Sequence, residues 1–271
     1  MDVAGLPAPG AVPPPPKAPL ARRLVDLLLW GGLLVVLLAS FGPVQMSRLG
    51  LVFANNANMR EFASEFLHPD MANWATYASQ MWLTIQIALW GTFLALIIAV
   101  PFGLACARNI SPVWLQQPMR ILMNVLRAAP DLVVGVVFIV AVGIGPLSGV
   151  LALAVNTGGV LAKLFSEAVE AIDPRPVEGV RATGATRLQE IVWGVIPQVG
   201  PLWTSYALYR FESNARSATV LGLIGAGGIG QTLFQSLQSF NFSAVSAISI
   251  VIIVAVSLID LLSQAMRKRL I

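Results

Sequence analysis

Forty-three consecutive residues, from Ser217 to Ile259, carry no formal charge. A helix needs about 20 apolar residues to cross the ~30 Å hydrocarbon core of a bilayer, so this stretch has roughly the length of two spans. Charged residues make up 11% of the whole chain and hydrophobic residues 56%, whereas about a quarter of a soluble domain is charged. We therefore predict an all-α integral membrane protein.

Six apolar stretches predict six transmembrane helices, with approximate bounds 27–44, 81–107, 121–145, 147–165, 195–216 and 242–266. Residues 217–238, before the last span, contain three glutamines and five glycines. Because irregular backbone is tolerated at membrane depth only where protein surrounds it, we expect a Gly-rich broken or re-entrant segment here. Residues 1–23 predict a disordered, Pro-rich cytoplasmic tail, and residues 24–271 form the transmembrane domain.

Basic residues predict the orientation of these spans. With both termini in the cytoplasm, 12 of the 17 Lys and Arg residues lie on that side, in segments 1–26, 108–120, 163–197 and 267–271. Cytoplasmic loops of membrane proteins carry an excess of Lys and Arg. We therefore expect the N- and C-termini to be cytoplasmic.

The glycines of the broken segment form a G-x-G-x-x-G pattern from Gly225 to Gly230. A dinucleotide site needs a preceding strand and an acidic residue about 20 positions on, but the first acidic residue here is Asp260. A P-loop needs a lysine where this chain has Gln231. We predict instead that the glycines serve helix packing or gating, since small residues let helices approach closely. They are Gly222, Gly225, Gly227, Gly228 and Gly230.

The cytoplasmic loop 166–197 contains defined helix signals. Asp173, which a proline follows, predicts the N-cap of a short helix that ends at Gly184. Thr186 opens a second helix through a capping box, and Pro197 is expected to end it at the membrane. A solvated charged loop is the alternative, but these starts and stops favour a docking surface.

The same loop resembles the EAA loop of ABC-importer permeases, whose pattern is E-A-A-x-x-x-G-x9-I-x-L-P. Three positions match the pattern, namely Glu178, Gly184 and Pro197. Four depart from it, namely Gly179, Val180, Gly194 and Ile196. The loop alone therefore indicates an ABC permease without specifying its substrate.

Longer stretches are similar to the permease subunit of phosphonate-type ABC importers, in the binding-protein-dependent transport inner-membrane component family. They are LRAAPDLV (126–133), GVLALAVNTGGVLAKLFSEAVEAID (149–173) and RFESNARSATVLGLIGAGGIGQTL (210–233). The resemblance is strong over about 120–271 and moderate in the second span. It implies a type I ABC-importer permease fold with six transmembrane helices and a cytoplasmic coupling-helix loop.

The resemblance also implies the partners. They are a second copy of the chain, two ABC ATPase subunits in the cytoplasm and an external or periplasmic substrate-binding protein. The chain is then a non-enzymatic transport subunit of the bacterial inner membrane, without a cofactor or nucleic acid of its own, and the ATPase binds ATP and Mg. Organophosphonate, phosphite and hypophosphite stay open as substrates. The residues expected to couple to the ATPase are Glu178, Gly179, Arg181, Gly184, Arg187 and Pro197.

Ionisable residues within predicted spans are candidates for function. Arginine suits an oxyanion because its planar fork matches the anion's geometry. The candidates for a translocation pathway are Arg127, Asp131, Arg210, Glu212, Asn214 and Arg216. The alternative is structural pairing, above all between Arg127 and Asp131 at i and i+4. Asp260 is expected to be structural and His68 to lie on the surface, and no metal site is expected.

Two other classes of function fit the sequence less well. A stand-alone secondary carrier or channel for a small anion usually contains repeated sets of spans, and this chain shows no internal repeat. An intramembrane enzyme would need a metal cluster or a nucleophile–base pair, and the sequence offers neither pattern. The importer permease is the interpretation that uses the docking loop.

Overall fold

The computed structural model describes residues 20–48, 50–51, 60 and 63–269. The predicted tail 1–23 lies outside this range except for its last four residues. Regular elements in the described part are all helices, and the chain divides into two compact units, Met1–Glu61 and Phe62–Ile271. The first unit contains α1 (Leu20–Ser40) and the short 3₁₀ helix η1 (Met46–Arg48).

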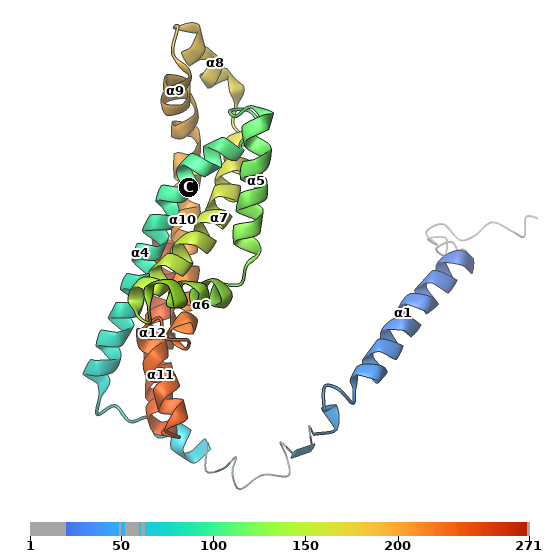
Figure 1. Cartoon of the computed structure of the whole chain (residues 1–271), viewed down its shortest axis with the longest axis vertical. Coiled ribbons are helices and arrows are strands. Elements are labelled where there is room, and N and C mark those ends of the chain that lie inside the picture. The colour runs from blue at the N-terminus through green and yellow to red at the C-terminus, as the bar shows by residue number, and fades with distance from the viewer. Residues whose placement is uncertain (1–19, 49, 52–59, 61–62, 270–271) are drawn as a thin grey trace, which may run out of the picture. The chain divides into compact units, whose positions relative to one another are not determined.

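The second unit is a helical bundle (Figure 1). Its elements are α4 (Trp74–Cys106), α5 (Val113–Ala128), α6 (Asp131–Val142), α7 (Pro146–Glu170), α8 (Pro174–Ala182), α9 (Arg187–Gln189), the π-helix η2 (Glu190–Val195), α10 (Ile196–Gly222), α11 (Ile229–Gln238) and α12 (Phe242–Arg267). In Figure 1, α8 and α9 project from one end of the bundle, and α11 lies toward the other end.

Helix α7 lies at the centre of the bundle, against α4, α5, α6 and α10. Small residues allow its close contact with α4, since a Cβ at Gly91 would lie 2.7 Å from the Cβ of Leu153. On the α10 side, the rings of Phe165 and Trp203 stack with their centroids 4.4 Å apart. Close packing of small and aromatic residues therefore holds α7 between α4 and α10.

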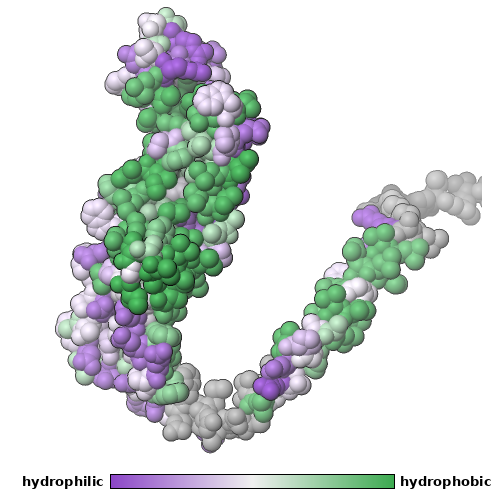
Figure 2. All heavy atoms as spheres, in the orientation of Figure 1, coloured by the Kyte–Doolittle hydropathy of each residue, from purple (hydrophilic) through white to green (hydrophobic). Residues whose placement is uncertain are grey.

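The distribution of side chains fits a membrane-spanning bundle. Figure 2 shows apolar residues over the middle of the second unit and hydrophilic residues gathered toward its two ends. Three helices, α4, α7 and α12, are long and apolar enough to cross a membrane. A fourth span is possible if α5 and α6 are counted together. The apolar part of α1, Leu24–Ser40, is shorter than these.

The prediction of one span over 121–145 was wrong in its shape. The chain bends by 92° between α5 and α6. Ala129 has an extended backbone with ψ 128°, because the ring of Pro130 disfavours the helical conformation in the residue before it. The side chain of Asn156 on α7 donates to the Ala129 carbonyl at 2.8 Å and so stabilises the bend.

The Gly-rich stretch interrupts the helical path, but later than predicted. Helix α10 continues to Gly222, past the expected end of that span at 216, and α11 begins at Ile229. Between them, Gly225, Gly227 and Gly228 have φ of +105°, +79° and +74°, a region that only glycine adopts freely. A helix rather than a strand therefore precedes the G-x-G-x-x-G pattern.

Candidate functional site

The projecting loop has the local structure that its helix signals predict. We use "coupling loop" for residues 171–195, since α7 continues to Glu170. The N-cap of α8 is confirmed, because Asp173 accepts from the Arg175 backbone N–H at 3.0 Å. The capping box is also confirmed, with the Thr186 backbone N–H donating to Gln189 Oε1 at 2.8 Å.

Pro197 does not end the second helix, and this prediction was wrong. The helical path runs from α9 through η2 into α10, and Pro197 lies in the first turn of α10. Proline has no N–H to donate within a helix, and the change from the π-helix η2 to the α-helix α10 lies next to it, between Val195 and Ile196. We call α8 the first arm of the coupling loop and η2 its second arm. The second arm is consequently continuous with the long helix α10.

The tip of the coupling loop is open on one side. Gly184 forms the turn with φ +83°, and nothing lies within 4 Å of a Cβ built on Gly179 or Gly184. Glu178 is exposed, and so is Trp193, at 70%. An open hollow on this face is lined by Pro176, Gly179, Val180, Thr183, Gly184, Ala185, Gln189 and Trp193. Three of the six predicted coupling residues, Glu178, Gly179 and Gly184, are therefore exposed on this projection.

Arg181 and Arg187 are less free than predicted, because both pair with Glu190. Arg181 Nε and Nη2 donate to Glu190 Oε1 and Oε2, each at 2.9 Å. Arg187 Nη1 lies 3.7 Å from Glu190 Oε2. The hydrogen bonds from Arg181 hold the pKa of Glu190 below its ordinary value, although burial acts in the opposite direction. The pair therefore contributes stability at neutral pH, and it is lost only as pH falls through this lowered pKa.

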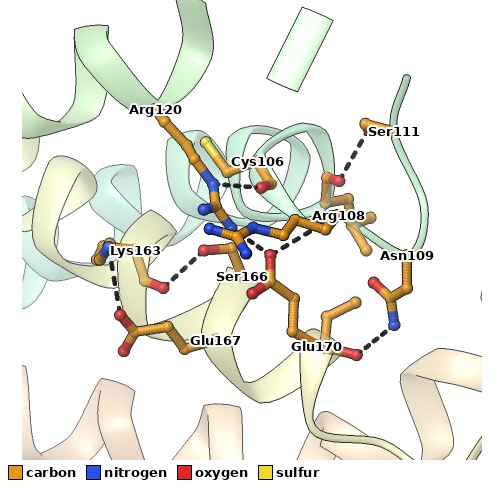
Figure 3. A network of polar contacts seen from close by, with 11 residues as sticks. Cys106, Arg108, Asn109, Ser111, Arg120, Lys163, Ser166, Glu167 and Glu170 are labelled. Carbon is orange, nitrogen blue, oxygen red and sulfur yellow. Dashed lines mark hydrogen bonds and ion pairs between the residues drawn. The ribbon is translucent and has the colours of Figure 1, made fainter. Parts of the chain in front are cut away.

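A second polar network joins the start of the coupling loop to its neighbouring helices (Figure 3). Glu170, the last residue of α7, pairs with Arg120 of α5 and accepts from the Arg108 backbone N–H at 2.8 Å. Arg120 Nε also donates to the Cys106 carbonyl at the end of α4, at 2.9 Å. The network thus links α4, α5 and α7 at the end of the bundle where the coupling loop begins.

The alternative role of Arg127 and Asp131, a structural pair with each other, is not observed, since the bend at Ala129 separates the helices that carry them. Asp131 accepts instead from the Ser217 hydroxyl at 2.8 Å. Arg127 is exposed on the isolated chain and forms no ion pair with any described residue. The sequence prediction placed Arg127 and Asp131 on one face of a single helix, and it fails because the helix is broken between them.

Glu212 and Arg216 belong to a balanced charge cluster between α10 and α12. Buried Glu212 accepts from Arg216 at 3.1 Å and from Arg267 at 3.2 Å. Arg216 also donates to Asp260 at 3.1 Å. Two arginines and two carboxylates therefore link the helices, and the predicted structural role of Asp260 agrees with this position.

Arg210 and Asn214 lie together on the side of α10 that faces α7. Asn214 is buried, accepts from Thr157 on α7 and donates to Thr92 on α4, both at 2.8 Å. Arg210 has one hydrogen bond, a long one of 3.4 Å to Thr157, and its Nε atom is buried without a partner. Among the described residues it forms no ion pair. Asn214 thus cross-links helices, while Arg210 has no carboxylate within ion-pair distance among the described residues.

Gly222, Gly228 and Gly230 lie where α10, α11 and α4 meet, whereas Gly225 and Gly227 lie against Ile144 and Pro146. A Cβ at Gly222 would be 2.7 Å from the Gly227 carbonyl oxygen, and one at Gly230 would overlap the Thr219 carbonyl oxygen. A Cβ at Gly228 would overlap the hydroxyl of Thr84, which accepts from the Ile229 N–H at 2.9 Å. These glycines permit close contact between helices.

The side chains that most often bind metal ions, those of His, Cys, Asp and Glu, do not cluster among the described residues. Within the described part of the chain, no three His, Cys, Asp or Glu side chains group closely enough to hold a metal ion. His68 is exposed, and its Nδ1 lies 2.6 Å from the Ser64 carbonyl oxygen. No metal chemistry is assigned to the residues described.

Sequence reasoning missed Glu190, which holds both arginines of the coupling loop. A signal existed, because Arg181 and Glu190 lie on either side of the predicted turn at Gly184 and a folded hairpin would bring them together. It also missed Arg267 and Glu170, whose partners come from distant helices. No local pattern marks such pairs.

Comparisons with known proteins agree with this geometry. Residues 99–271 match the family of binding-protein-dependent transport system inner membrane components. The phosphite transport system permease protein PtxC of Stutzerimonas stutzeri is 40% identical over 76% of this chain and 75% of that protein. The putative cryptic phosphonate transport system permease protein PhnE2 of Escherichia coli K12 is 62% identical over 45% of this chain and 99% of that protein. A chain of the MetNI methionine ABC transporter, solved facing inward, is 21% identical with a TM-score of 0.63, over 72% of this chain and 95% of that one.

The fold is therefore that of the membrane-embedded permease of an ABC importer. The chain belongs to the family of binding-protein-dependent transport system inner membrane components.

Proposed function

We propose that the chain is the permease subunit of an importer for a phosphorus oxyanion of the phosphonate or phosphite class. The observation that carries this proposal is the long match to permeases named for phosphite and phosphonate transport. The projecting coupling loop supports it, since a transporter driven by a separate ATPase needs a cytoplasmic docking surface. The stand-alone carrier has no such use for the loop, and no comparison supports it.

The proposed assembly contains two permeases, two ATPase subunits and an external binding protein. ATP and Mg bind to the ATPase subunits, and this chain hydrolyses nothing. The permease lies in the bacterial inner membrane with both termini in the cytoplasm. Its six membrane segments are α1, α4, the bent pair α5–α6, α7, α10 and α12, and the Gly-rich turn before α11 lies within the membrane as a broken segment.

The charged residues of the predicted pathway divide into a group with ion pairs and a group without them. The residues without ion pairs are the better candidates for contact with the substrate. Glu212 and Arg216 are neutralised within the α10–α12 cluster. Arg127 and Arg210 form no ion pair with a described residue, so their guanidinium groups are available to an anion. A conduit needs weak attraction, because a tightly bound ion is not released. We therefore assign oxyanion contact to Arg127 and Arg210 and a structural role to Glu212, Asn214 and Arg216.

Arg210→Met is expected to slow ATP-driven uptake by about tenfold, since a hydrogen bond to a charged group contributes about 1.5–3 kcal/mol. Its thermal stability should stay near that of the wild type, because no carboxylate loses a partner. Arg216→Met is the contrasting variant, and it should lower the Tm by leaving Glu212 and Asp260 less paired. Wild-type uptake rates in Arg210→Met would remove this residue from the pathway.

The substrate class is tested by competition. Proteoliposomes with the complete importer should accumulate labelled methylphosphonate or phosphite, and either unlabelled compound should inhibit the uptake of the other. Sulfate and methionine serve as controls that should not compete. Uptake that methionine inhibits and both phosphorus oxyanions leave unchanged would refute the proposed substrate class.

A further inference from the structure

Two contacts hold the arms of the coupling loop together before its tip. At the membrane end, Gln198 on α10 donates to the Asp173 carbonyl at 3.2 Å and accepts from the Asp173 N–H at 3.2 Å. Further out, η2 touches α8 so closely that a Cβ on Gly194 would lie 3.0 Å from the Val177 Cα. The two arms therefore lie side by side near the bundle.

The third contact between the arms is made by Glu190, and it lies nearest the tip of the loop. This carboxylate is buried, at 6% exposure, although it belongs to a projecting cytoplasmic loop. Arg181 of α8 holds both its oxygens, and Arg187 of α9 adds a further ion pair. A bidentate arginine–carboxylate pair fixes orientation as well as distance. Glu190 thus connects the first arm, the second arm and the short helix between them.

The second arm leads directly into the membrane. Glu190 begins the π-helix η2, and η2 continues into α10 without a break. Single-turn π segments occur frequently at functional positions in helices. Helix α10 in turn carries Arg210 and the cluster around Glu212. A displacement of η2 is therefore communicated to the part of the chain that carries the membrane charges.

We propose that Glu190 is a positioning residue for coupling, which joins α8 to η2 so that a displacement of α8 by the ATPase also moves α10. This inference rests on the proposed function. Without the pair, the part of α8 nearest the turn at Gly184 loses its connection to η2, because the contacts at Asp173 and Val177 hold only the part nearer the bundle. ATP hydrolysis then continues while less of it produces transport.

The test measures ATP hydrolysis and uptake together in proteoliposomes that contain the complete importer. Glu190→Ala and Arg181→Ala should each raise the number of ATP molecules hydrolysed per oxyanion imported by about tenfold, the scale of losing a hydrogen bond between charged groups. The double variant should be no worse than either single one, because both changes remove the same contact. Arg175→Ala is the matched control. Arg175 lies on the same helix, and neighbouring Asp173 is its one ion-pair partner among the described residues, so the ratio of this variant should stay within about twofold.

Glu190→Gln is the control for misfolding, because glutamine keeps the shape of the glutamate side chain and removes its charge. It should assemble normally with the ATPase, and its ratio should fall between the wild type and Glu190→Ala. A wild-type ratio in assembled Glu190→Gln and Glu190→Ala overturns the inference, as does uncoupling by Glu190→Ala without uncoupling by Arg181→Ala. If the wild-type importer itself shows no uptake, the proposed function fails instead, so the two failures are distinguishable.

Discussion

Gly230→Ala is expected to destabilise the bundle by about 3 kcal/mol, because an added methyl group forces tightly packed elements apart. The new Cβ would overlap the backbone carbonyl oxygen of Thr219 on α10. Backbone cannot move aside as a flexible side chain does, so α11 must shift away from α10. Thermal unfolding of the purified chain in detergent should show a clearly lowered Tm and a smaller monodisperse fraction.

Gly200→Ala provides the control for this change. Gly200 also belongs to α10, but nothing lies within 4 Å of its Cβ position, so its Tm should stay near the wild-type value. Gly222→Ala should behave like Gly230→Ala, since its Cβ would lie 2.7 Å from the Gly227 carbonyl oxygen. Equal stability of the Gly200 and Gly230 variants would show that these glycines do not set the packing of α10 on α11.

Glu178→Lys and Gly184→Asp should each reduce uptake by more than about tenfold while the chain still folds. A substitution at the centre of a protein interface costs 2 kcal/mol or more, and 1.4 kcal/mol is a factor of ten. Both positions are exposed, and nothing lies within 4 Å of a Cβ built on Gly184. Aspartate is also among the residues that tolerate positive φ, so the fold should accommodate it. Co-purification with the ATPase and uptake are the measurements.

The control is Glu65→Lys, the same charge reversal at an exposed residue outside the coupling loop. It should retain both ATPase binding and uptake. If the Glu178 and Gly184 variants bind the ATPase and transport at wild-type rates, the open face of the coupling loop is not the docking surface.

Much of the coupling loop could be predicted because its signals are local. Asp173 and Thr186 determine helix starts through contacts within three residues, and Gly184 provides the positive φ of the turn. Composition was likewise sufficient to predict an integral membrane protein, since long charge-free stretches exclude a soluble domain. These features need no knowledge of how distant helices pack.

The parts that sequence could not predict depend on tertiary contacts. Hydropathy treated 121–145 as one span because it averages over many residues and so passes over Pro130, whose ring breaks the helix. The same bend separated Arg127 from Asp131 and left Asp131 beside Ser217, 86 positions away. The ion pair of Arg267 with Glu212 joins residues 55 positions apart, and nothing in either neighbourhood indicates it.

Uptake with and without the ATPase subunit is the most direct test of the proposed function. Liposomes containing this chain alone, or this chain with its ATPase and binding protein, are loaded with ATP, and labelled phosphite or methylphosphonate is added outside. We expect accumulation only when all three proteins and ATP are present, and none with a nonhydrolysable ATP analogue. Accumulation by this chain alone, driven by an ion gradient and indifferent to ATP, would contradict an importer permease and establish a stand-alone carrier.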